Sequence, residues 1–250
     1  MICLTATHNA NDDLSSKVKR SDQYYPYILL IDSWILLNLL VGYNSNNYYQ
    51  MTMDSAVKTG YNIDDQYGTY FMTFTFVGWI DLLSRKELRD LMVESLSYCQ
   101  DHKGLVINAY VLMSSHMHMI CRANEDSDGL SRIIQDFKKY TAKEIIKWIE
   151  NDRRESRADW LKVVMKYHAK HQKNKSTYQV WQRSNQPKSC LHPRFTLQKI
   201  NYIHNNPVVA GYVDEPYEYV YSSARDYVGR HGLIDVEIVD FGVQEGYVLT

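Results

Sequence analysis

The sequence predicts an α+β fold in which helices pack on an antiparallel sheet. Three runs rich in β-branched, aromatic or aliphatic residues, between residues 69 and 123, have the composition of strands. A segment with helical periodicity separates the first run from the second, and only two serines separate the second from the third. The resulting order is strand, helix, strand, strand, and its last two strands form a hairpin.

The first residues differ from the rest of the chain, and we expect an atypical extension over residues 1–55 before a domain over residues 60–245. The extension contains an apolar run at residues 24–43, which Asp32 and Asn38 interrupt. It falls short of the ~20 clean apolar residues of a membrane span, so no convincing membrane partner is indicated. An added helix, or a start codon assigned too far upstream, explains the extension better.

The first three elements of the domain follow from local patterns. Residues 69–77, TYFMTFTFV, alternate threonine with larger apolar residues, as strands do. Residues 84–100 have a helical stripe, and Ser84 with Glu87 three residues later predicts a capping box at the start of that helix. LVINAYVLM (105–113) and HMHMICRA (116–123) then form the two strands of the hairpin.

The second half of the domain is predicted to be mainly helical. Apolar residues recur at helical spacing over residues 129–150, and a polar helical stretch continues to about His171. HQKNKSTYQ (171–179) breaks the pattern and is expected to be a loop. A last helix over residues 194–206 is expected to stop at Pro207, because proline lacks the N–H that continues a helix.

Charge is distributed unevenly along the chain, although the net charge is only −1. Residues 131–200 contain 17 Lys and Arg against 6 Asp and Glu, so this segment could face phosphates. A solvated helical face with its lysines in water is the ordinary alternative. The candidate contacts to a DNA backbone are Lys138, Lys139, Lys143, Lys147, Arg153 and Arg154.

The four cysteines are far apart in the sequence and include no CxxC pair. They occur in a sequence without a convincing cleavable signal, so a cytoplasmic location with free thiols is expected.

The stretch MSSHMHMI (113–120) places two histidines two residues apart. Because alternate residues of a strand share a face, His116 and His118 project together while their methionine neighbours point into the opposite layer. Two neutral imidazoles with one further donor can hold a divalent ion, and two hydrogen-bonded histidines on a half-buried strand are the alternative. Histidine-triad hydrolases would need a third histidine at position 120, which is isoleucine.

A third donor and a nucleophile are available on the last helix. At about 100° per residue, Tyr202 and Asn206 lie close together on the side opposite the apolar stripe. A metal held by the two histidines and Asn206 would therefore lie near the Tyr202 hydroxyl. The apolar stripe consists of Leu197, Ile200, Ile203 and His204.

Tyr140, with Glu144 one turn later, is the alternative nucleophile and ligand. It lies at the edge of the apolar stripe of helix 129–150, where a tyrosine bordering the core is the ordinary interpretation.

These segments together resemble the single-tyrosine HUH transposases, and among them the REP-associated tyrosine transposases. VLMSSHMHMI (111–120) matches the hydrophobic-Met-x-x-His-hydrophobic-His motif, and YIHNNPVVAG (202–211) matches Tyr-Ile-x-x-Asn-Pro-Val-x-x-Gly. The resemblance covers about residues 60 to 240. Ser114 and Ser115 replace the usual Pro-Asn before the first histidine. Supporting matches are YFMTFTFVGWIDLLSR, DFKKYTAKEI, VWQRSNQP and YVYSSARDY.

The resemblance implies a ferredoxin-like antiparallel sheet, the HUH endonuclease fold, with the histidines on a central strand. It implies that His116, His118 and Asn206 bind Mg²⁺ or Mn²⁺ and that Tyr202 is the catalytic nucleophile. The expected activity is nicking and rejoining of single-stranded DNA, at a hairpin or repetitive palindrome, through a covalent 5′-phosphotyrosine. The enzyme would act as a monomer or a homodimer.

Two other functions are compatible with the same residues. The chain could be a catalytically silent DNA-binding regulator of repeat sequences with the same fold. It could also be a metal-dependent phosphoesterase that uses the histidine pair on small molecules.

Overall fold

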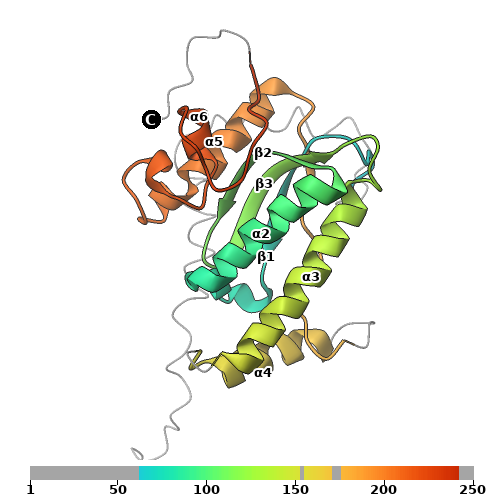
Figure 1. Ribbon diagram of the computed structural model, residues 1–250, viewed down its shortest axis with the longest axis vertical. Coiled ribbons are helices and arrows are strands. Elements are labelled where there is room, and N and C mark those ends of the chain that lie inside the picture. Colours follow the sequence, from blue (N-terminus) through green and yellow to red (C-terminus); the bar gives the residue numbers. More distant parts are fainter. Residues whose placement is uncertain (1–61, 153–154, 171–175, 242–250) are drawn as a thin grey trace, which may run out of the picture. The chain divides into compact units, whose positions relative to one another are not determined.

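The computed structural model describes residues 62–152, 155–170 and 176–241 (Figure 1). All of them belong to one compact unit, Thr59–Thr250. The expected extension over residues 1–55, with its apolar run, lies outside the described residues. Within the described ranges no helix has both the length and the apolar character needed to cross a bilayer.

A four-stranded antiparallel sheet has the strand order β2-β3-β1-β4. β2 and β3 form the predicted hairpin, and β3 pairs along its other edge with β1, so that β3 is a central strand. The register places Thr73 opposite His118 and Thr75 opposite His116. The α+β fold is confirmed, with the strand order of ferredoxin-like proteins. The strands are β1 Tyr70–Thr75, β2 Leu105–Leu112, β3 His116–Ala123 and β4 Lys188–Ser189.

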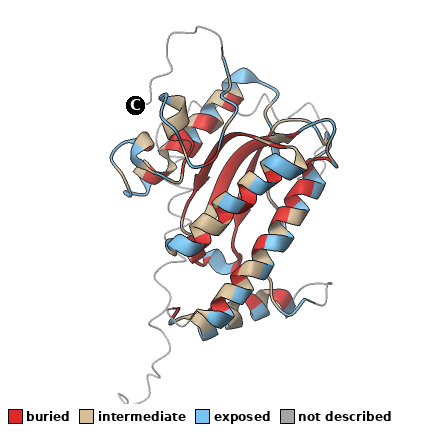
Figure 2. Ribbon diagram, viewed as in Figure 1, coloured by how far each residue is buried: buried red, intermediate tan, exposed pale blue. Residues whose placement is uncertain are grey.

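Helices cover both faces of the sheet (Figure 1). α2 and α3 pack on one face, here called the α2/α3 face, and α5 packs on the other, the α5 face. Figure 2 shows strands that are buried along most of their length and helices that bury one side only. The helices are α2 Lys86–Lys103, α3 Leu130–Asn151, α4 Ala158–Lys170, α5 Pro193–Val209 and α6 Ala224–Tyr227; short 3-10 turns are η1 Val77–Trp79, η2 Leu82–Ser84 and η3 Pro216–Glu218.

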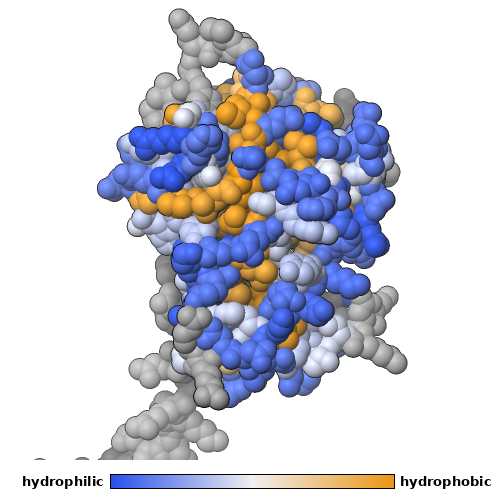
Figure 3. Space-filling view, viewed as in Figure 1, coloured by the Kyte–Doolittle hydropathy of each residue, from blue (hydrophilic) through white to orange (hydrophobic). Residues whose placement is uncertain are grey.

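The alternation of side chains along the strands divides the core into two clusters. Met117 and Met119 of β3 point into the larger cluster on the α2/α3 face, as predicted, and contribute about 1.5–3 kcal/mol each by burial. Ile120 of β3 joins Ile200 and Ile203 of α5 in the smaller cluster on the opposite face. At the surface, hydrophobic side chains form a band between the C-terminal segment and α2, whereas the outer sides of the helices are hydrophilic (Figure 3).

The start of α2 differs from the predicted capping box. The N-cap residue is Arg85, and no side chain caps the helix. The Ser84 hydroxyl instead donates a hydrogen bond to the Asp81 carbonyl at 2.7 Å. Residues 82–84 form the 3-10 turn η2, and Ser84 is the last residue of that turn. The serine therefore does not occupy the N-cap position of α2.

The expected end of the last helix was also wrong, because α5 continues through Pro207 to Val209. Proline's fixed φ is compatible with a helix, and near the C-terminus its missing N–H removes only one backbone hydrogen bond. The helix ends in a Schellman motif, in which the Tyr212 N–H donates to the Pro207 carbonyl and the Gly211 N–H to the Val208 carbonyl. Gly211 has φ +71°, the left-handed conformation that this motif requires.

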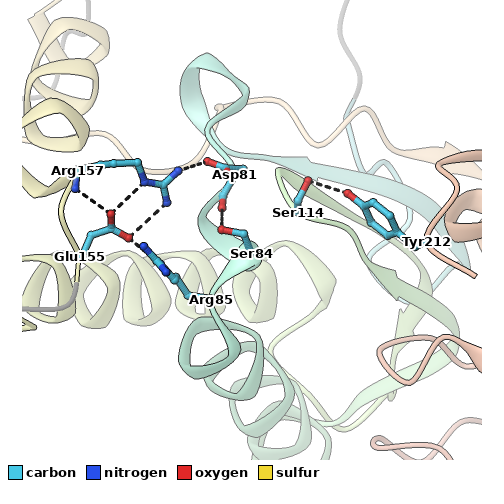
Figure 4. A network of polar contacts seen from close by, with 7 residues as sticks. All are labelled: Asp81, Ser84, Arg85, Ser114, Glu155, Arg157 and Tyr212. Atoms are coloured by element: carbon cyan, nitrogen blue, oxygen red, sulfur yellow. Dashed lines mark hydrogen bonds and ion pairs between the residues drawn. The ribbon is translucent and has the colours of Figure 1, made fainter.

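A buried carboxylate connects the segment before α4 to the start of α2 (Figure 4). Glu155, whose side chain is fully buried, accepts hydrogen bonds from Arg85 at 2.9 Å and from Arg157 at 3.0 Å. Arg157 also pairs with Asp81 at 2.6 Å. The hydrogen bonds from Arg157 and Arg85 lower the pKa of Glu155 to about 2, against the opposing effect of desolvation.

Candidate active site

The two histidines of β3 project from the same face of the sheet, as predicted, and that face is the α5 face. Their ring centroids are 4.9 Å apart, with the ring planes inclined at 72°. Burial lowers the pKa of His116 to about 4. Burial, with smaller contributions from His116 and Lys199, lowers the pKa of His118 to about 3. Both imidazoles are therefore neutral at pH 7, the form in which histidine binds a metal.

A hydroxyl group lies beside the Nδ1 atom of each imidazole. Thr73 Oγ1 is 2.9 Å from Nδ1 of His118, and Ser115 Oγ is 3.2 Å from Nδ1 of His116. Such contacts fix the orientation of the ring and the tautomer. If each Nδ1–H donates to its hydroxyl, the Nε2 atom is left as an acceptor or ligand.

Tyr202 extends from α5 toward this pair. Its hydroxyl oxygen is 3.3 Å from Nε2 of His118, and its ring packs edge-on against His118 with the centroids 5.1 Å apart. The residue is 37% exposed, so a ligand from solvent can reach it. Burial raises the pKa of Tyr202, and a hydrogen bond with the Asn206 side chain partly opposes this. The phenol is therefore protonated at pH 7.

The two sides of α5 differ as the helical periodicity predicts. Ile200, Ile203 and His204 are fully buried, whereas Tyr202 and Asn206 lie on the other side. His204 has its Nε2 atom 2.9 Å from the Ser223 hydroxyl and packs against a tyrosine of α6, so it belongs to the core. The structure thus brings His118, Tyr202 and Asn206 together.

The types of donor on these residues are ones that a divalent ion accepts. Two neutral imidazoles and one amide oxygen are a mixed nitrogen and oxygen set. No group of three His, Cys, Asp or Glu side chains suited to a metal occurs among residues 62–152, 155–170 and 176–241. The third donor here would be an amide, which is a different type of ligand. Metal binding by His116, His118 and Asn206 stays a prediction.

The predicted DNA contacts lie elsewhere. All four that are described belong to α3, on the α2/α3 face, and Arg153 and Arg154 lie outside the described residues. Lys138 donates hydrogen bonds to the carbonyls of Gln182 and Arg183 and to Asn185, at 2.7 to 3.3 Å, and burial lowers its pKa to about 8. Its ammonium group is thus engaged within the protein. The exposed ones are Lys139, Lys143 and Lys147.

Tyr140, the alternative nucleophile, is not near the histidines. It belongs to α3 and lines a groove of about 700 Å³ between α2 and α3, together with Tyr98. It is 54% exposed and thus does not border the core closely. Glu144 contacts Lys147 at 3.5 Å. Within one chain the sheet separates Tyr140 and Glu144 from the histidine pair.

Four residues near the histidines were not identified from the sequence. Thr73 and Ser115 became visible only through strand register and hairpin geometry. Trp79 is 51% exposed, has a left-handed φ of 54° and contacts the His116 ring edge-on at 5.5 Å. Lys199 lies over the ring of Tyr202 at 5.4 Å. Its spacing of three residues before Tyr202 is the one signal that sequence could have supplied.

The free thiols expected for this chain are confirmed for Cys99, Cys121 and Cys190. Cys3 lies outside the described residues.

Comparison with known proteins gives distant structural similarity and no match in sequence. No protein-family model and no curated protein match the chain. The chain is similar to a solved structure of a REP-associated tyrosine transposase bound to a REP hairpin. That similarity has a TM-score of 0.44 and 21% sequence identity, and it covers 78% of this chain and 99% of the other.

Proposed function

We propose that this protein is a metal-dependent strand transferase that nicks and rejoins single-stranded DNA through Tyr202. The observation that supports the proposal best is the 3.3 Å distance between the Tyr202 hydroxyl and Nε2 of His118. This distance supports the proposal because it puts a partly exposed phenol beside one of the two neutral imidazoles.

In the proposed reaction the oxygen of Tyr202 attacks the phosphorus of a DNA phosphodiester. A bond forms between that oxygen and phosphorus, and the bond from phosphorus to the 3′ oxygen breaks. The phenol loses its proton to solvent, and the leaving 3′ oxygen gains one. The products are a 5′-phosphotyrosine on the protein and a free 3′-hydroxyl. Attack by another 3′-hydroxyl reverses the sequence, and this rejoining requires no ATP because the phosphotyrosyl bond replaces the broken diester.

His116, His118 and Asn206 would hold a divalent ion, Mg²⁺ or Mn²⁺, which when bound supplies Lewis-acid polarisation of the phosphate oxygens. Thr73 and Ser115 orient the two imidazoles through Nδ1, as outer partners of metal-binding histidines do. The hydrogen bond from Asn206 favours the ionised form of Tyr202.

Positioning supplies much of the required rate. α5 is a regular helix anchored on the sheet by buried isoleucines, so Tyr202 approaches the site from a rigid element. Well-oriented intramolecular reactions gain about 7 kcal/mol or more over reactions between free partners. The substrate is single-stranded because in-line attack requires an unpaired backbone that can bend. A nearby hairpin or short palindrome would present such a strand.

The test is incubation of the protein with labelled, hairpin-bearing single strands and Mn²⁺, followed by denaturing electrophoresis. A protein-linked label that is lost in Tyr202→Phe and retained in Tyr140→Phe supports the proposal. Tyr140→Phe is the matched control because it removes the same hydroxyl from the opposite face of the sheet.

Three other results would contradict the proposal. Loss of the adduct in Tyr140→Phe alone would give the role of nucleophile to α3. Tight binding of hairpin DNA without an adduct would indicate a regulator that binds repeat sequences. Hydrolysis of small phosphodiesters without any protein-linked product would indicate a phosphoesterase.

A further inference from the structure

Lys199 has an unusual environment one turn before Tyr202 on α5. Its ammonium nitrogen lies over the faces of three aromatic rings, at 5.1 Å from the centroid of Phe71, 5.3 Å from Phe195 and 5.4 Å from Tyr202. The side chain is half-buried, and residues three apart on a helix lie on the same side. The cation is therefore held next to the Tyr202 ring by packing.

The charge of Lys199 has no anionic partner within the described part of the chain. No Asp or Glu there forms an ion pair with it. The ring faces attract the ammonium group, but they do not provide hydrogen-bond acceptors for its three protons. Burial, together with the nearby charge of Lys188, lowers the pKa of Lys199. An anion arriving from solvent would satisfy this site.

The position of the charge indicates what that anion would be. The ammonium group lies over the face of the Tyr202 ring and forms no hydrogen bond with the Tyr202 hydroxyl. The Phe71 ring, over which the ammonium group also lies, stacks on the His118 ring with the centroids 5.5 Å apart. A group that approaches the Tyr202 oxygen from solvent therefore enters the positive field of Lys199.

We propose that Lys199 binds the phosphate that Tyr202 attacks, through a charged hydrogen bond to a non-bridging oxygen. This inference rests on the proposed function, and it adds a phosphate-binding residue to the site. The aromatic rings hold the lysine stem in place, so the ammonium group is positioned before the substrate binds. The ligand is the scissile phosphodiester of a single strand.

A thermodynamic cycle tests this contact. The scissile linkage is first mapped with the wild-type protein by adduct formation. Binding is then measured in the Tyr202→Phe background, which keeps the ring beneath Lys199 but prevents cleavage. Each protein is titrated with two oligonucleotides, one natural and one carrying an uncharged methylphosphonate at the mapped linkage. Fluorescence anisotropy at fixed salt concentration with Mn²⁺ gives the affinities.

Adding Lys199→Met should weaken binding of the natural strand roughly tenfold and binding of the methylphosphonate strand less than about twofold. Equal losses on both strands, or no loss on either, would overturn the inference. Lys188→Met is the matched control, since Lys188 is an exposed lysine near Lys199 and, unlike Lys199, has no cation–π contact with Phe71, Phe195 or Tyr202. It should weaken both strands equally, and the same discrimination in this variant would also overturn the inference.

Failure of the proposed function would be recognised separately. If the wild-type protein forms no adduct on any single strand, both proposals fail together. If the adduct forms on Tyr202 but the cycle shows no coupling, only the assignment of Lys199 is wrong. Thermal unfolding of Lys199→Met beside the parent protein shows whether a loss of affinity comes from a loss of folding.

Discussion

Neighbouring side chains of β3 face opposite environments, and the two faces of the sheet differ accordingly. On the α2/α3 face, Met117 and Met119 pack into a continuous apolar core. On the α5 face, His116 and His118 interrupt the apolar surface, and hydroxyl groups and the phenol of Tyr202 surround them. The α2/α3 face is thus apolar throughout, whereas the α5 face combines a smaller apolar cluster with a group of polar side chains around Tyr202.

The largest expected effect separates these roles at two adjacent positions. His118→Ala should reduce adduct formation by about 1000-fold, because it removes a proposed metal ligand beside the nucleophile. Its free energy of unfolding should fall by about 2 kcal/mol, because His118 is buried and packs against the rings of Phe71 and Tyr202. Adduct yield on a labelled strand and urea unfolding measure the two quantities. An active His118→Ala protein would contradict the assignment.

Met119→Ala should have the opposite profile. Met119 is fully buried in the α2/α3 core, and truncation leaves a cavity that should cost about 3 kcal/mol of unfolding free energy. At temperatures below its midpoint of thermal unfolding, the folded Met119→Ala protein should still form the adduct at a rate close to that of wild type. A folded but inactive Met119→Ala protein would show that the two faces are not independent.

A third prediction concerns the buried Glu155, which lies outside both clusters. Its folded-state pKa of about 2 is below the ordinary value of 4.5, so its stabilising effect is fully present above pH 4.5. That effect is lost as pH falls from about 4.5 toward 2. The difference between these two pKa values corresponds to at most about 3 kcal/mol of unfolding free energy.

Glu155→Gln should therefore be less stable than wild type at neutral pH, and the difference should shrink as the solution is acidified through this window. Urea unfolding at a series of pH values measures it. A stability difference that stays constant from pH 7 to pH 3 would show that Arg157 and Arg85 do not hold the carboxylate ionised.

The smallest effect is expected at Thr73, which lies opposite His118. Thr73→Val keeps the shape of the side chain and removes the hydroxyl next to Nδ1, so the rate of adduct formation should fall about tenfold. Thr75→Val is the matched control, because Thr75 lies opposite His116 and its hydroxyl has no hydrogen bond to either imidazole. Equal effects of both substitutions would show that the Thr73 hydroxyl does not contribute to adduct formation through His118.

Patterns with a short period were sufficient to predict the elements that carry the site. Alternation along β3 placed His116 and His118 on one face, and the helical period of α5 placed Tyr202 and Asn206 away from its buried side. Both patterns are local, since each depends only on the geometry of a single strand or helix. The proximity of Tyr202 to His118 needed the additional fact that α5 packs on that face.

Features that depend on packing between elements could not be predicted in this way. The contact of Thr73 with His118 depends on the register between β1 and β3. The basic composition of residues 131–200 did not reveal which face α3 would cover, and α3 packs opposite the histidines. Lys138 is engaged by backbone carbonyls that are more than forty residues away in the chain.

We propose that the chemistry belongs to the α5 face and that Tyr202 performs it. Fragmentation mass spectrometry of the protein, after reaction with a single-stranded hairpin substrate and nuclease trimming, locates the attached nucleotide directly. We predict a nucleotide joined through its 5′-phosphate to Tyr202. It should be found in the tryptic peptide that begins at Ile200, directly after Lys199. A nucleotide attached to Tyr140, or to any residue of the α2/α3 face, would contradict it.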